Sequence, residues 1–137
     1  MTKWAAFGIE LKKGGTAYAQ VTNLSGPGLS LDTEDVTSHD SSGAWEEVVA
    51  TILRSGEITM DIAYDPAGAT HKYAAGGLLY DLVARTAIEF TLVFPNHATH
   101  TTWTFTAFVT GFEPSAPVDG ALTASVTFKL TGAPTLV

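Results

Sequence analysis

The fold class is decided most clearly by the stretch EITMDIAY at positions 57–64. Its residues alternate strictly, so that every second side chain falls on the same side of an extended chain. The side chains that share one face are Ile58, Met60, Ile62 and Tyr64. A period of two predicts a β-strand with one buried face. The Asp65-Pro66-Ala67-Gly68 segment that follows predicts a turn.

Three more strands are expected downstream, over residues 87–94, 101–112 and 122–130. Their inward side chains are expected to be Ile88, Phe90, Leu92 and Phe94; Trp103, Phe105, Ala107 and Val109; and Leu122, Ala124, Val126, Phe128 and Leu130. The chain is expected to break between them at Pro95-Asn96-His97 and at Pro114-Ser115-Ala116-Pro117. Strands at this spacing favour an antiparallel sandwich or barrel.

Between residues 70 and 85 the apolar period changes to three or four, which predicts an amphipathic helix of about four turns. Asp81 and Arg85 are spaced for an ion pair one turn apart. Gly76-Gly77 weakens this helix by about 1 kcal/mol per glycine and indicates the close approach of another element. One helix among strands gives a β-dominated α+β fold, an antiparallel β-sandwich or barrel with one flanking helix.

The first half of the chain is less regular. Short strands over residues 4–11 and 18–24 would flank Lys12-Lys13-Gly14-Gly15. Residues 25–43 are expected to form a long acidic loop, or a long hairpin if Leu29, Leu31 and Val36 pair. Residues 44–54 are expected to form a short helix, capped by Ser42 or Gly43 and ended by Ser55-Gly56.

Length and composition limit the function. With 137 residues, the chain is expected to form a single domain over residues 1–137. Fourteen acidic against 7 basic residues give a net charge of −7, which argues against binding to nucleic acid through phosphates. There is no cysteine, and no apolar run is long enough to span a membrane. The N-terminus lacks the pattern of a signal peptide, so synthesis and folding in the cytoplasm are expected.

Catalytic motifs are largely missing. Ser38-His39-Asp40 has the residue types of a hydrolase triad, but neighbours on an extended chain point to opposite sides. His97-Ala98-Thr99-His100 has no third metal ligand nearby and is interpreted as a solvated loop. Neither a phosphate-binding loop nor a nucleophile elbow is present. We therefore expect a protein that is not an enzyme and that needs no cofactor or metal.

Two aromatic residues suggest assembly. In the strand over residues 101–112, Phe108 and Phe112 are expected on the face opposite the core. A strand with apolar residues on both faces lies within two layers or is covered by a partner subunit. The low charge content of 15% also suits a surface that is largely consumed by assembly.

The order of motifs resembles the tail tube (major tail) proteins of long-tailed, siphovirus-like bacteriophages. The resemblance covers residues 15–137 and rests on these segments: Ser25-Gly26-Pro27-Gly28-Leu29-Ser30-Leu31-Asp32, Asp35-Val36-Thr37-Ser38-His39-Asp40-Ser41, Trp45-Glu46-Glu47-Val48-Val49, Ser55-Gly56-Glu57-Ile58, Tyr64-Asp65-Pro66 with Thr70-His71, Gly111-Phe112-Glu113-Pro114-Ser115-Ala116-Pro117-Val118 and Thr131-Gly132-Ala133-Pro134. Thr51 and Arg54-Ser55 depart from the family pattern, as does Gly76-Gly77.

The resemblance implies a virion protein whose copies form homo-hexameric rings, stacked into a hollow tube. Its implied partners are further copies of itself, a tape-measure protein, a tail terminator and tail-tip or baseplate proteins. Double-stranded DNA would pass through the lumen without specific binding. The acidic stretch from Asp32 to Glu47 would contact neighbouring rings. The candidate subunit and ring interface residues are Leu29, Leu31, Asp32, Asp35, Val36, Asp40, Phe108 and Phe112.

Two alternatives remain open at this point. A tail terminator with the same fold would form a single ring that does not polymerise. A carbohydrate- or ligand-binding β-sandwich, such as a decoration module, would expose an aromatic platform on one face. An enzyme is the weakest interpretation, because no nucleophile, base and orienting group occur together.

Overall fold

The computed structural model describes residues 3, 7–13, 16–17, 20–94 and 102–136. In this part of the chain the strands are β1 (Glu10–Lys13), β2 (Thr16–Ala17), β3 (Gln20–Ser25), β4 (Ser30–Asp35), β5 (Val48–Arg54), β6 (Glu57–Ala63), β7 (Ile88–Val93), β8 (Thr102–Ser115) and β9 (Thr123–Leu136). The same residues form one α-helix, α1 (Leu78–Ala84), and one 3-10 turn, η1 (Ser42–Ala44).

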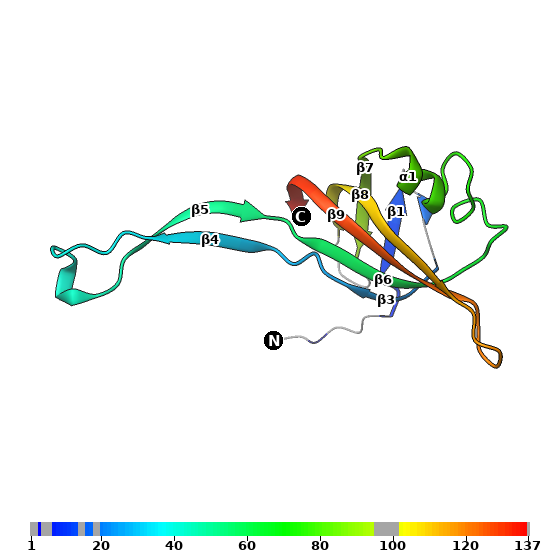
Figure 1. The fold of residues 1–137 in the computed structure, drawn as a ribbon, viewed down its shortest axis with the longest axis horizontal. Helices are drawn as coiled ribbons and strands as arrows, with labels where there is room; N and C mark the ends of the chain where they lie inside the picture. Colours follow the sequence, from blue (N-terminus) through cyan, green and yellow to red (C-terminus); the bar gives the residue numbers. More distant parts are fainter. Residues whose placement is uncertain (1–2, 4–6, 14–15, 18–19, 95–101, 137) are drawn as a thin grey trace.

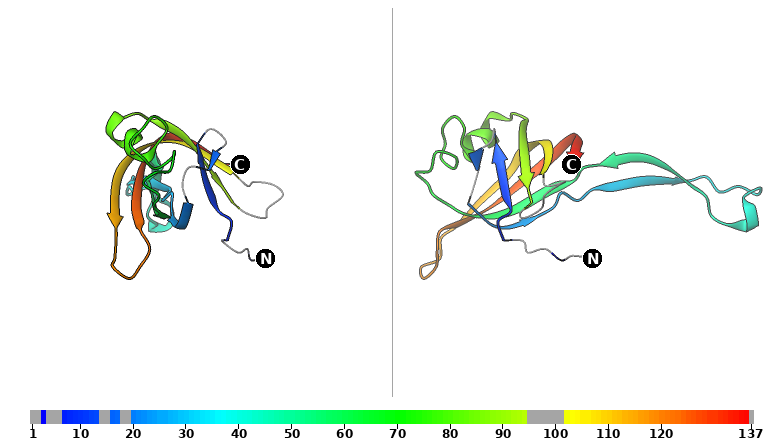
Figure 2. Two further views of the ribbon diagram at one scale, coloured as in Figure 1. Left: turned by 90° about the vertical axis from the view of Figure 1, so that its right-hand side faces the viewer. Right: turned by 180° about the vertical axis from the view of Figure 1, so that it is seen from behind.

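Seven strands form one antiparallel sheet in the order β2-β1-β7-β8-β9-β6-β3. The sheet is strongly twisted, and α1 with its neighbouring loops lies at one end of this body (Figure 1). β4 and β5 form a separate two-stranded sheet that projects far from the body, as the view from behind also shows (Figure 2). The predicted fold class is confirmed: the described chain is mostly β, with one flanking helix.

The core contains the side chains that the period of two placed inward. The fully or almost fully buried apolar residues of the described chain are Leu11, Ile58, Met60, Ile62, Leu78, Phe90, Leu92, Phe105, Ala107, Val109, Ala124, Val126, Phe128 and Leu130. Tyr64, Ile88, Phe94 and Trp103 are partly buried against this cluster. Leu122 departs from the prediction, because it precedes β9 and is 36% exposed.

A bulge in β8 corrects the prediction for Phe112. The pairing with β9 shifts register between Val109 and Gly111, so that Val109 faces Phe128 and Phe112 faces Val126. Paired residues share a face of the sheet, so the extra residue turns Phe112 toward the core side. Its ring packs edge-on against Tyr64, with centroids 5.1 Å apart. Phe108 keeps the predicted outward position, opposite Lys129.

The break predicted at residues 114–117 begins later than expected. β8 continues through Pro114 to Ser115, and these residues pair with Ala124 and Thr123. The other predicted break, at residues 95–97, and the motif at residues 97–100 lie outside the described residues.

The helix is much shorter than the four turns predicted. It begins after Gly77, which has an extended backbone and serves as the N-cap residue. A Cβ atom at Gly77 would lie only 1.9 Å from the carbonyl oxygen of Lys72, so the close approach is made by the segment's own backbone. Residues 70–76 form turns and bends instead. Arg85 ends the helix in the left-handed conformation.

The turn predicted after β6 is confirmed. Gly68 donates its backbone N–H to the carbonyl oxygen of Asp65 over 3.0 Å. The backbone N–H of Asp65 in turn donates to Nδ1 of His71, also over 3.0 Å. The His71 side chain is buried, and this burial lowers its pKa below the ordinary value, outweighing the opposing effect of Asp65. The neutral imidazole thus serves as a hydrogen-bond acceptor that holds the turn.

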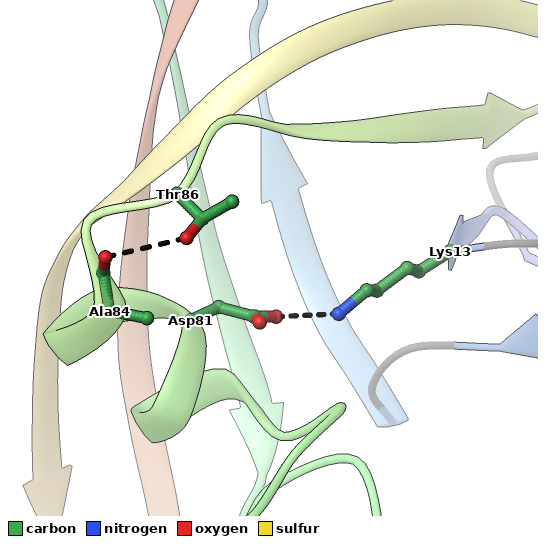
Figure 3. A network of polar contacts seen from close by, with 4 residues as sticks. All are labelled: Lys13, Asp81, Ala84 and Thr86. Atoms are coloured by element: carbon green, nitrogen blue, oxygen red, sulfur yellow. Dashed lines mark hydrogen bonds and ion pairs between the residues drawn. The ribbon is translucent and has the colours of Figure 1, made fainter.

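Asp81 pairs with a residue far away in sequence, not with the Arg85 predicted one turn along. Nζ of Lys13 donates to Oδ2 of Asp81 over 2.9 Å, which joins β1 to α1 (Figure 3). At the end of the same helix, the hydroxyl of Thr86 donates to the carbonyl oxygen of Ala84 over 3.3 Å (Figure 3). The Asp81 carboxylate is almost fully buried, whereas Lys13 is a quarter exposed.

We expect Lys13→Met to lower the free energy of unfolding by about 2 kcal/mol, because it removes the cation from a buried carboxylate. Lys12→Met is the matched control, since Lys12 forms an exposed pair with Glu10 at 3.5 Å and should cost less than about 0.5 kcal/mol. Urea denaturation of both variants measures the difference. Equal stability of the two variants would show that the link between β1 and α1 contributes nothing.

Candidate assembly surface

The projecting hairpin, here called the arm, comprises residues 29–54. β4 pairs antiparallel with β5 from Ser30↔Arg54 to Asp35↔Val48. The hairpin alternative for residues 25–43 is right only for its first strand, because β4 lies in that range but pairs with β5, which lies beyond it. The short helix predicted over residues 44–54 is wrong, because β5 occupies most of that range and only η1 is helical. β-Branched residues dominate β5, which explains why it is extended.

The arm continues from the β3–β6 pair after a short interruption at its base. Gly56 has a φ of +70°, and a Cβ atom there would lie 2.4 Å from the carbonyl oxygen of Gly28. Gly26 has a φ of +104° and approaches the carbonyl oxygen of Glu57 equally closely. Glycine meets both requirements, a positive φ and close backbone contact. The two chain segments that connect the arm to the body are therefore packed closely against each other.

The tip of the arm is held by polar contacts. Ser41, which is 8% exposed, donates its hydroxyl to the Glu47 carboxylate over 2.9 Å. The backbone N–H of Ser38 donates to the same hydroxyl oxygen over 3.0 Å. Across the tip, the N–H of Glu47 donates to the Thr37 hydroxyl over 2.8 Å. The Ser-His-Asp sequence here is part of a turn, in which the Asp40 N–H donates to the Ser38 hydroxyl.

The arm exposes apolar side chains along its length. Every residue of β5 is exposed. The large apolar side chains that the arm exposes are Leu29, Leu31, Val36, Trp45, Val48, Val49, Ile52 and Leu53. A two-stranded hairpin is marginal in water by itself, and an exposed apolar surface of this extent marks an interaction site. The arm is therefore the strongest candidate for a docking element in the described chain.

The apolar side chains lie on both faces of the arm. Leu31 pairs with Leu53, and on the same face Asp35 pairs with Val48, while Glu34 pairs with Val49 on the other. A register shift between Leu31 and Thr33 separates the two halves of the ladder. An arm that is apolar on both faces suits a position between other protein surfaces better than one on the outside of an assembly.

The arm also carries most of the net negative charge of the protein. Six acids and one arginine give it −5 of the total −7: Asp32, Glu34, Asp35, Asp40, Glu46, Glu47 and Arg54. Nε of Arg54 pairs with Oδ2 of Asp32 over 2.8 Å. The side chain and backbone N–H of Thr37 both hydrogen-bond to Asp35 and hold the pKa of that carboxyl below its usual value. The arm is therefore anionic at neutral pH.

The structure gathers six of the eight predicted interface residues on the arm: Leu29, Leu31, Asp32, Asp35, Val36 and Asp40. Phe108 lies apart from them, on the outer face of β8, and Phe112 packs against the core. The sequence analysis missed the exposed apolar residues of the second strand, because it assigned them to a helix. The signal was the β-branched run at Val48, Val49, Thr51 and Ile52.

A smaller exposed apolar patch lies on and beside α1. It comprises Tyr73, Tyr80 and Val83, and the two tyrosine rings lie 6.0 Å apart. The patch belongs to the body and not to the arm, so the described chain exposes apolar side chains on both parts.

Within the described ranges, no group of three His, Asp or Glu side chains is arranged to hold a metal ion. None of the helices in those ranges has the length and apolar character needed to cross a membrane. The structure of the predicted solvated loop at residues 97–100 is not described.

A folded body with a long apolar arm defines a subunit that is built for assembly. The chain belongs to the lambda phage tail tube protein family, whose model matches residues 12–137. It is therefore a structural component of the tail of a phage or phage-like particle, and not an enzyme. No curated protein sequence was found to match it.

Solved structures share the fold at low sequence identity. A chain in the virion of a native gene transfer agent particle has a TM-score of 0.75 and 15% identity, covering 98% of this chain and 99% of that one. A chain in the tail of the empty gene transfer agent particle, computed with C6 symmetry, has a TM-score of 0.68 and 16% identity, covering 94% and 93%. A chain in the tube-terminating cap of the anti-feeding prophage has a TM-score of 0.70 and 14% identity, covering 100% and 93%.

Proposed function

We propose that this tail tube protein polymerises as stacked hexameric rings into a hollow conduit for DNA delivery. The observation that carries the proposal is the arm, which is apolar on both faces and contacts nothing of the described body beyond its base. The six-fold symmetry of the similar gene transfer agent tail supports the ring number. A contact between two different patches, such as arm and body, is heterologous and can propagate.

In this proposal the arm contacts a neighbouring ring, and the body makes the contacts within a ring. The interface then includes Leu29, Leu31, Asp32, Asp35, Val36 and Asp40 on the arm, with Phe108 on the body. Because Phe112 packs inward in the isolated chain, its role in this proposal is to support β8 from the core side and not to contact another copy. A tape-measure protein, a terminator and tail-tip or baseplate proteins are the further partners.

DNA passage needs a lumen that does not hold phosphates. Seven basic against 14 acidic residues leave few cations to pair with DNA, so the duplex can slide without specific binding. The proposal therefore treats DNA as cargo and not as a ligand.

The second candidate function is a single-ring tail terminator, favoured by the likeness to a chain in the tube-terminating cap. A decoration module that binds carbohydrate has less support, because Phe112 does not join Phe108 in an aromatic platform. A terminator would bind the end of a tube and stop its growth. A tube subunit would instead stack on further copies of itself and lengthen the tube.

Negative-stain electron microscopy of the purified protein, across protein and salt concentrations, tests these functions. Hollow tubes or stacked rings are expected. Single unstacked rings under every condition would favour the terminator, and isolated monomers that bind glycans would favour the decoration module.

We expect added salt to promote assembly. Each copy carries −7, and rings bring the anionic arms of several copies together, so repulsion opposes polymerisation at low ionic strength. The screening length falls from about 30 Å at 0.01 M salt to about 8 Å at 0.15 M. Sedimentation of the polymer should show a severalfold lower critical concentration at 0.15 M. Faster disassembly at the higher ionic strength would contradict this expectation.

A further inference from the structure

The tip of the arm presents a large aromatic side chain in a prepared position. Trp45 is 77% exposed. Its backbone N–H donates to the carbonyl oxygen of Ser42 over 3.3 Å, and its indole lies against Gly43, where a Cβ atom would be 3.1 Å from Cδ1. Exposing an indole is unfavourable in water, and fixing it beforehand lowers the entropic cost of binding. The tip thus has the properties of an anchor residue.

A hollow of about 310 Å³ lies at the other end of the arm, where the arm's base meets the C-terminal part of β9. We call it the base hollow. Its lining residues are Leu29, Ser30, Leu53, Arg54, Ser55, Gly132, Ala133, Pro134 and Leu136. Most of this lining is apolar, as expected of a pocket that takes an aromatic ring.

We propose that Trp45 of one copy inserts into the base hollow of another copy. This inference rests on the proposed function, because it names the contact through which stacked copies engage. Charge agrees with the pairing: Glu46 and Glu47 directly follow Trp45 at the tip, and Arg54, whose Nε pairs with Asp32 of its own copy, lines the base hollow. A guanidinium beside an indole also adds a cation–π attraction.

The two surfaces cannot meet within one copy. Strands rise about 3.3 Å per residue, so Trp45, nine residues from Arg54, stands about 30 Å from the base of its own arm. The two ends of the arm are well separated along the long axis of the molecule (Figure 1). Because the tip and the base hollow are different patches, each copy can give one contact and receive another, and the contact repeats along a stack.

Disulfide cross-linking tests the contact directly, since the natural chain contains no cysteine. The variant with both Ala44→Cys and Ala133→Cys, which keeps Trp45 and places an exposed thiol beside it, is oxidised under assembly conditions and run on a non-reducing denaturing gel. A ladder of covalent multimers is expected, and each single variant should stay largely monomeric. The matched control replaces Ala133→Cys with Val118→Cys, which is fully exposed at the far end of the β8–β9 hairpin. A ladder in the control as strong as in the test variant, or no ladder in the test variant, would overturn the proposal.

Trp45→Ala provides the second measurement. We expect it to raise the critical concentration for assembly about 30-fold, the effect of losing one hot-spot side chain. Tubes of Trp45→Ala that form at the native concentration would overturn this contact and leave the tube function intact. If the native protein forms only discrete particles, the polymer proposal fails. The cross-linking experiment is then carried out on those particles, where covalent multimers would support the Trp45 contact and monomers would refute it.

Discussion

Replacing residues 29–54 with Asn-Gly should abolish assembly and leave a folded monomer. All the buried apolar core residues of the described chain lie outside the arm, so its removal takes nothing from that core. The backbones at Gly28 and Gly56 already lie in contact, and Asn-Gly forms the two-residue turn that closes such a hairpin. We expect the critical concentration to rise more than about 100-fold, because the loss removes several hot-spot side chains at once. The free energy of unfolding should change by less than about 1 kcal/mol.

Analytical ultracentrifugation and urea denaturation measure the two quantities on the same preparation. Glu34→Gln serves as the control, since it changes one exposed polar residue of the arm and should still assemble. Tubes formed without the arm would refute its role in assembly. A deleted protein that fails to fold would show that the arm supports the body in a way that the buried residues do not indicate.

Phe90→Ala should cost about 3–5 kcal/mol of folding free energy, the largest effect on stability expected from one substitution. Phe90 is fully buried at the centre of the core. Its ring centroid lies 5.1 Å from that of Phe128 and 6.1 Å from that of Phe105. The substitution loses the apolar transfer free energy, leaves a cavity and removes both ring contacts. Domains are stable by about 5–15 kcal/mol, so about a fifth or more of the total would be lost.

Phe108→Ala is the control for this substitution. It removes the same side chain from the outer face of the neighbouring strand, where Phe108 is 37% exposed. It should cost less than about 1 kcal/mol in the monomer, measured by the urea midpoint at unchanged slope. Equal costs at the two positions would contradict the assignment of inner and outer faces.

The sequence predicted the body well because its strands have one buried face. In β6, β7 and β9 the alternation of apolar and polar residues reports burial directly, and the structure confirms those faces. The bulge beside Gly111 was missed, because the prediction extended a strict period of two from Val109 to Phe112, although a glycine inside a strand can mark a bulge. The helix was too long in the prediction, because periodicity at Leu78, Leu79 and Leu82 does not locate its N-cap at Gly77.

The arm escaped sequence analysis for a different reason. β5 has apolar residues on both faces, so neither a period of two nor a helical period is clear. Every residue of β5 is exposed, so burial within the described chain imposes no alternation on its sequence. Composition still indicated the candidate surface, because no Lys or Arg occurs among the acidic residues between Asp32 and Glu47.

The antiparallel ladder of the arm has a consequence for how tubes of this kind can diversify. Because side chains alternate with period two, inserting one residue in each strand would exchange the two faces of everything beyond the insertion. Insertions of two residues in each strand preserve the faces and lengthen the arm by about 7 Å. The distance from arm base to tip can therefore change only in discrete steps, and the axial repeat of a polymer joined by such arms would evolve by increments of that size.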